Sequence, residues 1–440
     1  MIRCNAPTKS GFCSIFHAER ICCYLMFLSG FIGQAIFTID FGIFQLFLYR
    51  SFLVLLWALF AARTLIQGKM TLPQGRIKQV LGFFGIWLVY SIMSLGWAAS
   101  KSDAIRHVII LFTSVSLIFF AAYYFRKDQD LKNLYILWFG VFCSFILLGS
   151  WEHLTGHHLP FSLYYGETRS WLMYCPTGVF YNPNDYATFL AISIPFALSL
   201  IRYGKSMQIQ IAGLGAVTAA IYLIVEIGSR ANILAMMLEL AFSFMFLSNL
   251  RQKIKISIAV FIVVGICFFI FPDAVLGFFS TFAWQLNSID TQAKLDSGSV
   301  ATRANLIRNG LEFLYDSAGF GVGAGNAEYW VSNFARYDTE GVINLHNWWL
   351  EILVNYGIII FAGYVAMYFW LIWSLLRNLK VARDSWERMI GEALLVALIG
   401  FALASVSSSS IMGFIPSWML LAFIMAFLNH MHRTTAVIKI

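Results

Sequence analysis

Charged residues are scarce in this chain. They make up 12% of its 440 residues, whereas 60% of the residues are hydrophobic. Apolar runs of about 17 to 25 residues recur along the sequence, and this is the length that a helix needs to cross the hydrocarbon core of a membrane. The composition therefore excludes an ordinary soluble enzyme and predicts an all-α polytopic membrane protein.

The sequence also lacks the short motifs of several large functional classes. It has no Walker loop, no dinucleotide-binding fingerprint and no zinc-finger spacing. Its 7 cysteines give no disulfide framework, because only Cys175 falls on the side that we expect to face outward. The net charge of +8 comes largely from basic residues in loops, so it indicates membrane topology and gives no reason to expect nucleic-acid binding.

We expect about twelve transmembrane helices in a single integral membrane domain, residues 1–440. An even number of crossings places both termini on one side, and the loops of that side hold most of the 30 Lys and Arg residues, which predicts cytoplasmic termini. The segment 1–38 has a basic start and an apolar core but no small-residue cleavage site, so we expect it to be the first retained span. The expected spans are centred near Gly30, Val54, Leu88, Leu117, Phe142, Ile194, Val217, Phe242, Val263, Gly363, Gly400 and Phe423.

Two of the expected outer loops are long, residues 152–185 and residues 273–346, and long loops commonly carry function. In the larger loop, the segment 302–316 is predicted to form an amphipathic helix along the membrane surface. The run 319–325 follows, with glycine at every second position, which permits close approach of the backbone to a ligand; a flexible connector is the alternative. The apolar face of the predicted helix consists of Leu306, Ile307, Leu311 and Leu314, and the polar face of Asn305, Arg308, Asn309 and Glu312.

Two arginines on the expected outer side are not explained by topology. Arg230 lies in a very short connection after the seventh span, where a charge is costly and therefore usually functional; the alternative is a helical ion pair with Glu226, four residues earlier. Arg303 opens the predicted surface helix, where a cation opposes the helix dipole and so does not stabilise the helix. Its alternative is a surface arginine that reaches into water.

His346 joins the large loop to the apolar run 348–376. A histidine at a helix start is commonly a cap or an interface residue. Here Asn347, Glu351 and Asn355 follow at helical spacing, and such a polar stripe on an apolar helix must face the bundle or a water-filled cavity. The stripe predicts that a site is lined at this junction.

Four pieces of sequence occur in a particular order and on the same expected side of the membrane. They are Gly178-Val-Phe-Tyr-Asn182-Pro-Asn184-Asp-Tyr, then Gly228-Ser-Arg230, then Arg303 followed by Gly319-Phe-Gly-Val-Gly323, and last His346-Asn347-Trp-Trp-Leu350-Glu351-Ile-Leu-Val-Asn-Tyr-Gly357. This pattern resembles the O-antigen ligase and polymerase superfamily of bacterial surface-polysaccharide enzymes. The resemblance covers residues 170–375 with motifs and the whole chain with topology.

The resemblance implies a GT-C-like fold and an inverting glycosyltransferase, acting on the outer face of the bacterial cytoplasmic (inner) membrane without a metal or a nucleotide cofactor. The donor would be a polyprenyl-pyrophosphate-linked glycan, such as an undecaprenyl-pyrophosphate-linked one, and the acceptor a glycan or lipid. Ligase and polymerase stay open, because they share the donor chemistry. The residues that would bind substrate are Arg230, Arg303, Asn347, Asn184 and Arg106, with His346 as the catalytic residue near the acceptor hydroxyl.

A multi-span transporter, such as a repeat-unit flippase, is the alternative class. Transporters usually show internal repeats, broken helices and charges near the membrane midplane. In this sequence no repeat at a fixed spacing is visible, and most of the unexplained polar residues gather at the outer rim.

Two further pairs of residues have plain structural interpretations. Arg50 and Glu239 lie inside expected spans and should face the bundle interior, either as a structural pair or in contact with the donor lipid. His153 and His157 are four residues apart, but Gly156 argues against a regular helix and no third ligand is evident. We therefore expect no metal site.

Overall fold

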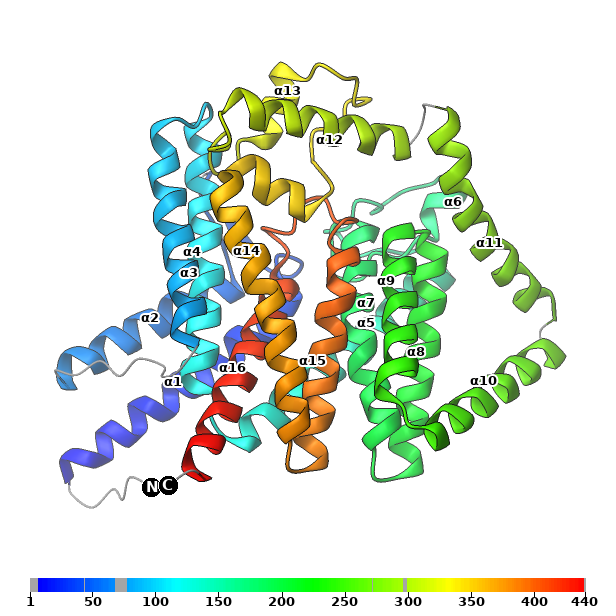
Figure 1. Cartoon of the computed structure of the whole chain (residues 1–440), viewed down its shortest axis with the longest axis horizontal. Helices are drawn as coiled ribbons and strands as arrows, with labels where there is room; N and C mark the ends of the chain where they lie inside the picture. Colours follow the sequence, from blue (N-terminus) through cyan, green and yellow to red (C-terminus); the bar gives the residue numbers. More distant parts are fainter. Residues whose placement is uncertain (1–6, 43, 68–76, 271, 296–298, 439–440) are drawn as a thin grey trace.

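The computed structural model describes residues 7–42, 44–67, 77–270, 272–295 and 299–438, and this part of the chain is mostly helical (Figure 1). The β-structure in these residues is a small antiparallel hairpin in which Ile39 pairs with Leu46. The elements are α1 (Pro7–Ile32), β1 (Thr38–Asp40), β2 (Gln45–Phe47), α2 (Leu48–Gln67), α3 (Ile77–Met93), η1 (Ser94–Gly96), α4 (Lys101–Tyr124), α5 (Asp128–Thr155), α6 (Ser170–Met173), α7 (Pro183–Tyr203), α8 (Met207–Ile227), α9 (Arg230–Phe242), η2 (Ser243–Leu247), α10 (Leu250–Ile270), α11 (Pro272–Leu295), α12 (Ser299–Asp316), α13 (Ala327–Phe334), α14 (Trp348–Val381), α15 (Ser385–Ala404) and α16 (Ile415–Ile438).

A helix is present at each of the twelve positions where the sequence predicts a membrane span. Within the described residues, nine helices are long and apolar enough to cross a membrane. α1, α10 and α15 are not among these nine, and α10 and α15 carry charged side chains in their first two turns. The prediction of an all-α, multi-pass membrane protein is confirmed, and the number of twelve crossings stays a prediction.

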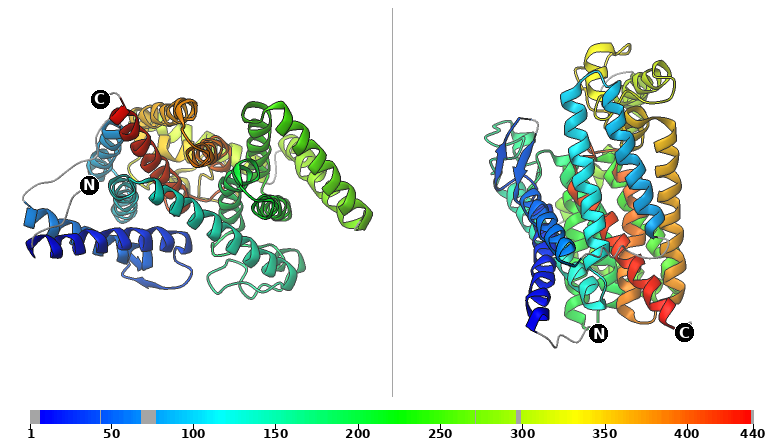
Figure 2. Two further views of the ribbon diagram at one scale, coloured as in Figure 1. Left: turned by 90° about the horizontal axis from the view of Figure 1, so that it is seen from below. Right: turned by 90° about the vertical axis from the view of Figure 1, so that its left-hand side faces the viewer.

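The helices form a bundle with two distinct ends (Figure 1). α12 and α13 lie across one end, which we call the loop end, whereas α1 begins and α16 ends near the opposite end, which we call the terminal end. α7 packs against α8, α9 and α15, and α4 packs against α16. Seen from below, α1 and α2 lie at one edge of the molecule and α10 and α11 at the other (Figure 2).

The large loop begins with a helix that the sequence reading missed. We expected residues 273–346 to be a loop outside the membrane, but α11 occupies Pro272–Leu295. Figure 1 shows α10 leaving the bundle near the terminal end and α11 running back along its flank to the loop end. The first half of α11 is apolar between Val275 and Trp284, and the polar residues that suggested a loop lie mostly in its second half.

The helix predicted over residues 302–316 is present as α12, but its buried face differs from the predicted one, and its place along the membrane surface stays a prediction. Ile307 and Leu311 are 40% and 50% exposed, whereas Asn309 is fully buried. The Asn309 side chain donates to the carbonyl of Tyr337 (2.8 Å) and accepts from the backbone N–H of Arg336 (2.8 Å), so its burial is compensated by hydrogen bonds that no hydrophobic pattern reports.

The glycine-rich run 319–325 docks on the protein's own backbone. Gly357, at φ +75°, kinks α14, and the carbonyls of Val354 and Asn355 accept hydrogen bonds from the N–H groups of Val322 (2.8 Å) and Gly323 (3.1 Å). Gly321 has φ +83°, and a β-carbon there would lie 2.5 Å from the nitrogen of Gly357. The glycines therefore let this run pack closely against α14. Its N–H groups donate to carbonyls that lose their helical hydrogen bonds at the kink.

Candidate active site

Arg230, Arg303 and His346 come together at the loop end. They belong to three different elements, since Arg230 is the first residue of α9, Arg303 lies on α12, and His346 precedes α14. Burial and the charge of Arg230 lower the pKa of the Arg303 guanidinium, and the charge of Arg303 in turn acts on His346. Arginine stays protonated through such shifts, so the two guanidinium groups form a cationic pair beside a titratable imidazole.

His346 is held in an unusual backbone conformation. Its φ is +48°, in the left-handed region that a residue with a side chain seldom adopts and that recurs at functional sites. Burial, followed by the charge of Arg303, lowers the pKa of His346 below its usual value, although the carbonyls of Ser407 and Ser408 act in the opposite direction. These effects favour a neutral imidazole at neutral pH.

A loop that the sequence reading did not single out connects these residues. We call residues 405–414, between α15 and α16, the serine loop. The hydroxyl of Ser407 lies 2.6 Å from that of Ser229 and donates to Oδ1 of Asn184 (3.1 Å). The signal in the sequence was the run Ser405-Val-Ser-Ser-Ser-Ser410, since five serines between two apolar helices are unlikely to face lipid.

The turn before Arg230 is fixed by hydrogen bonds. Gly228, at φ +72°, ends α8 in the left-handed conformation, so Glu226 lies on α8 and Arg230 on α9. The two residues are therefore not one turn apart on a single helix, as the alternative ion pair required. The amide of Asn232 donates to the hydroxyls of Ser229 (2.9 Å) and Thr188 (3.2 Å), which ties the start of α9 to α7.

The polar stripe after His346 mainly holds other parts of the protein. Oδ1 of Asn347 accepts from the N–H of Trp349 (3.1 Å) and caps α14. Buried Glu351 accepts from the hydroxyl of Ser410 (2.7 Å), and Oδ1 of Asn355 accepts from the N–H of Ala327 (2.9 Å). Glu351 and Asn355 are buried and face the bundle, as predicted, and that the stripe lines a site stays a prediction.

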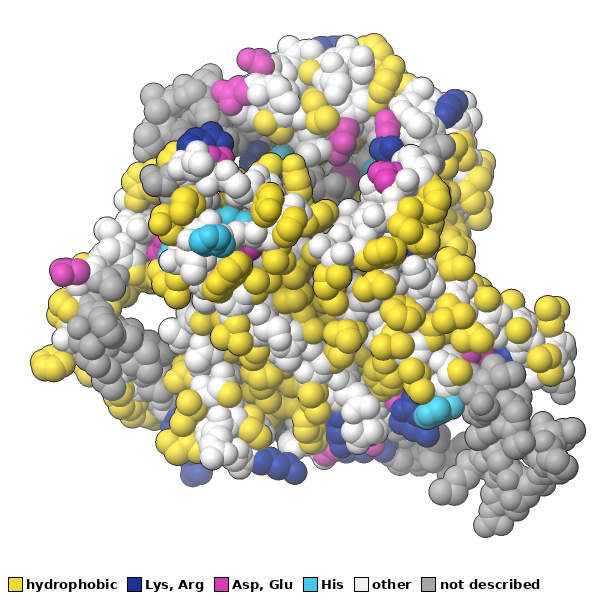
Figure 3. Space-filling model, turned by 180° about the vertical axis from the view of Figure 1, so that it is seen from behind, with side chains coloured by type: hydrophobic (Ala, Val, Ile, Leu, Met, Phe, Trp, Pro, Cys, Tyr) yellow, Lys and Arg dark blue, Asp and Glu magenta, His cyan; other side chains and the backbone are white. Residues whose placement is uncertain are grey.

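Arg106 is not grouped with Arg303 and His346. It shares with Arg50 a separate cavity of about 510 Å³, on the side of the serine loop that bears Ser409 and Ser410. Seen from behind, the surface is hollowed towards the loop end, and side chains of Lys or Arg, Asp or Glu, and His gather around this hollow (Figure 3).

Arg50 and Glu239 are both buried, as expected, but they do not form a pair. The guanidinium of Arg50 donates to the carbonyl of Gln45 (2.6 Å) and lies over the Phe47 ring. Glu239 packs against Gly400 of α15, and its carboxylate has no hydrogen-bond partner among the residues that the structure describes.

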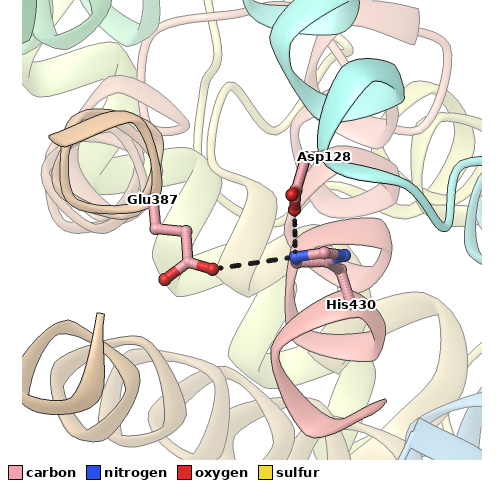
Figure 4. A group of neighbouring side chains, drawn as sticks. All are labelled: Asp128, Glu387 and His430. Carbon is pink, nitrogen blue, oxygen red and sulfur yellow. Dashed lines mark ion pairs between the residues drawn. The ribbon is translucent and has the colours of Figure 1, made fainter. Parts of the chain in front are cut away.

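The residues that could hold a metal lie far from this site. Among the described residues, one group has suitable ligands within reach of one another: Asp128, Glu387 and His430 (Figure 4). Nε2 of His430 is 2.7 Å from Asp128 and 3.8 Å from Glu387. These residues belong to the first turns of α5 and α15 and to the second half of α16, at the terminal end, whereas His346 lies at the loop end.

His153 does not form the metal site that its spacing with His157 suggested. Its two ring nitrogens lie 2.9 Å from the carbonyl of Tyr174 and 2.9 Å from the hydroxyl of Tyr222. Gly156, at φ +70°, ends α5, as the sequence predicted.

Comparison with known proteins agrees with the motif order. The sequence profile of the O-antigen ligase family matches residues 214–365, a segment that contains Arg230, Arg303 and His346. The chain is also 32% identical over 420 residues to the teichuronic acid biosynthesis protein TuaE of Bacillus subtilis (strain 168), and the alignment covers 93% of this chain and 84% of that protein. The chain is therefore a multi-pass membrane protein that belongs to the O-antigen ligase and polymerase superfamily of surface-polysaccharide enzymes.

Proposed function

We propose that the protein transfers a glycan from a polyprenyl-pyrophosphate carrier to an acceptor sugar hydroxyl, on the outer face of the bacterial cytoplasmic membrane. The observation that carries this proposal is the convergence of Arg230, Arg303 and His346 from three separate elements at one end of the bundle. With both termini cytoplasmic, as the basic loops predict, the loop end faces outward.

Arg230 and Arg303 suit the pyrophosphate of the donor. The leaving group of the reaction is a polyprenyl pyrophosphate, and its negative charge grows as the glycosyl bond breaks. Two guanidinium groups offer paired N–H donors that match phosphate oxygens and keep their charge at physiological pH. They supply the positive charge that stabilises the departing group, so the proposed reaction needs neither a metal nor a nucleotide.

His346 is the proposed general base. The acceptor hydroxyl oxygen attacks the anomeric carbon, the bond from that carbon to the pyrophosphate oxygen breaks, and the hydroxyl proton passes to the imidazole. Attack opposite to the leaving group inverts the anomeric centre. A base must be unprotonated to act, and the lowered pKa of His346 favours that form at neutral pH.

Asn184 and the amide nitrogen of Asn347 are the proposed contacts to the glycan, because they border the same group of residues. Asn184 accepts a hydrogen bond from Ser407, which contacts the turn before Arg230, and Asn347 follows His346 directly in the chain. The similarity to TuaE supports an acidic surface polysaccharide of the teichuronic acid type as the product.

The test uses purified protein in proteoliposomes with a fluorescent undecaprenyl-pyrophosphate-linked glycan. We expect a longer glycan and free undecaprenyl pyrophosphate without an ion gradient, and loss of both products with Arg303→Gln. Arg308→Gln is the matched control, because Arg308 lies on the same helix but is exposed and hydrogen-bonded to Asn305. Movement of the intact lipid-linked glycan across the bilayer without transfer would instead support the flippase alternative.

A further inference from the structure

The cavity on the second side of the serine loop lies between helices of both chain halves. We call it the hairpin cavity, because Gln45 and Phe47 of β2, the second strand of the hairpin, line it. Its volume is about 510 Å³, and its walls come from α1, β2, α2, α4, the segment 179–182 and the serine loop. Two of the helices that line it, α2 and α4, are long and apolar enough to cross a membrane.

Two cations line the hairpin cavity. Arg50 is 8% exposed, and its Nε is buried without a hydrogen-bond partner in the part of the chain that the structure describes. Its Nη1 donates to the carbonyl of Gln45 (2.6 Å). Arg106 exposes about half of its side chain, forms an ion pair with Asp103 through Nη1 (3.8 Å) and donates from Nη2 to the carbonyl of Gly42 (3.1 Å). Each named bond uses one of the five N–H groups of a guanidinium, so both arginines retain donors for an anion.

The rest of the wall is largely apolar. Phe31, Phe47, Tyr49, Ile110 and Phe414 contribute to it. An apolar wall beside two guanidinium groups matches the chemistry of an amphiphile with an anionic headgroup, since the chain meets apolar side chains and the headgroup meets the cations. A free polar sugar would leave the apolar wall without a partner.

One carboxylate also lines the cavity and has to be accounted for. Asp185 accepts a hydrogen bond from Nδ2 of Asn182 (3.2 Å), and the backbone N–H of Asp185 is capped by Oδ1 of Asn182 (3.0 Å). Asn182 in turn donates to the hydroxyl of Ser409 (2.8 Å). This carboxylate therefore takes part in a hydrogen-bonded turn against the serine loop.

The cavity adjoins the proposed site of chemistry. Asn344, two residues before His346, lines it, as do Ser409 and Ser410. The preceding serines of the same loop, Ser407 and Ser408, contact the other side: Ser407 bonds to Ser229, and both interact with His346. One short loop thus separates the hairpin cavity from the arginines proposed to bind the donor, and the segment 344–346 borders both sides.

We propose that the hairpin cavity is the acceptor subsite and that Arg50 and Arg106 bind the phosphate headgroup of a second polyprenyl-linked glycan. This inference rests on the proposed function and deepens it. The glycan of the second lipid would extend past Asn344, and its terminal hydroxyl would meet His346 opposite the donor. An enzyme with a polyprenyl-phosphate site on each side of its base joins two lipid-linked glycans, which is the reaction of a polymerase.

Binding stoichiometry tests this directly. Radiolabelled undecaprenyl pyrophosphate is titrated onto the full-length protein in phosphatidylcholine nanodiscs. The wild type is expected to bind two molecules, Arg50→Gln/Arg106→Gln one, and Arg230→Gln/Arg303→Gln one. Lys101→Gln is the matched control and should keep two, because Lys101 is on α4 like Arg106 but contacts the carbonyl of Gly96 outside the cavity.

Each other outcome is informative. A wild type that binds one molecule, lost only in Arg230→Gln/Arg303→Gln, overturns the acceptor subsite and leaves the proposed function intact. Two molecules bound by Arg230→Gln/Arg303→Gln with undiminished transfer would overturn the proposed function itself. Displacement of the second molecule by phosphatidylglycerol at an equal concentration would identify a general anionic-lipid site and also overturn the proposal.

Two further variants test whether a loss of binding comes from the missing guanidinium groups and not from misfolding. Arg106→Gln alone changes an exposed side chain and should weaken binding at the second site roughly tenfold or more, the usual effect of losing a hydrogen bond to a charged group. Arg50→Lys keeps the charge of a buried residue. If thermal unfolding matches the wild type and Arg106→Gln binds both molecules with unchanged affinity, the subsite assignment is wrong.

Discussion

The backbone of His346 offers a way to separate its chemical role from its structural one. A residue with a β-carbon in the left-handed region costs about 1–2 kcal/mol, whereas glycine adopts this region freely but loses about 0.5–1 kcal/mol more backbone entropy on folding. At φ +48° the first effect is the larger. His346→Gly should therefore be more stable than His346→Ala by about 1 kcal/mol, although both variants lose the imidazole.

The assay combines unfolding and transfer on the same preparations. Purified variants in detergent are unfolded with SDS and followed by tryptophan fluorescence, and transfer is measured in proteoliposomes. Both variants should lose transfer by about 100-fold or more, the usual contribution of a general base. His157, an exposed loop residue without positive φ, is the control, and there the glycine variant should be the less stable one.

Two results would refute this reasoning. Equal stability of His346→Gly and His346→Ala would mean that the left-handed conformation stores no strain. Near wild-type transfer by either variant would remove His346 from the chemistry. Inactivity together with increased stability would indicate a residue kept for function at a cost to folding.

Three more predictions concern the neighbouring residues. Arg303→Gln removes a positive charge that acts on His346, so the pKa of the imidazole should rise when it is titrated directly by NMR in the purified variant; an unchanged pKa would contradict the coupling. Arg230→Lys keeps the charge but loses the paired donors, so undecaprenyl pyrophosphate should bind roughly tenfold more weakly in a titration, and unchanged affinity would argue against a phosphate contact. Gly321→Ala should destabilise the protein by roughly 3 kcal/mol in SDS unfolding, against about 1 kcal/mol for Gly341→Ala, which has a similar φ but open space around it; equal losses would contradict the docking of the loop on α14.

Some of the site could be predicted because the constraint on each residue is local. A charge in a short connection between two membrane spans must be functional or paired, and this singled out Arg230. His346 stood out because it separates a polar segment from an apolar one. The relation of these residues to Arg303 could not be predicted from spacing, because three elements far apart in the chain meet through tertiary packing.

Other residues were misassigned because hydrophobicity does not report hydrogen-bonding partners. Asn309 was predicted on a polar face, yet it is buried, since its side chain compensates the burial by hydrogen bonds to Arg336 and Tyr337 in a loop. The serine loop was passed over because single serines carry no charge and tolerate many environments. Its importance follows from its contacts with Ser229, Asn184 and His346.

The amino-acid sequence by itself determined the class of protein, the positions of twelve of the helices and the family, because membrane hydrocarbon requires long apolar segments and because the order of the motifs can be seen in the sequence alone. Only the tertiary structure decided which cations share a site. It placed Arg303 beside His346 and put Arg106 with Arg50 across the serine loop. The physical reason is that electrostatic interactions depend on distance in space, which helix packing sets and sequence separation does not.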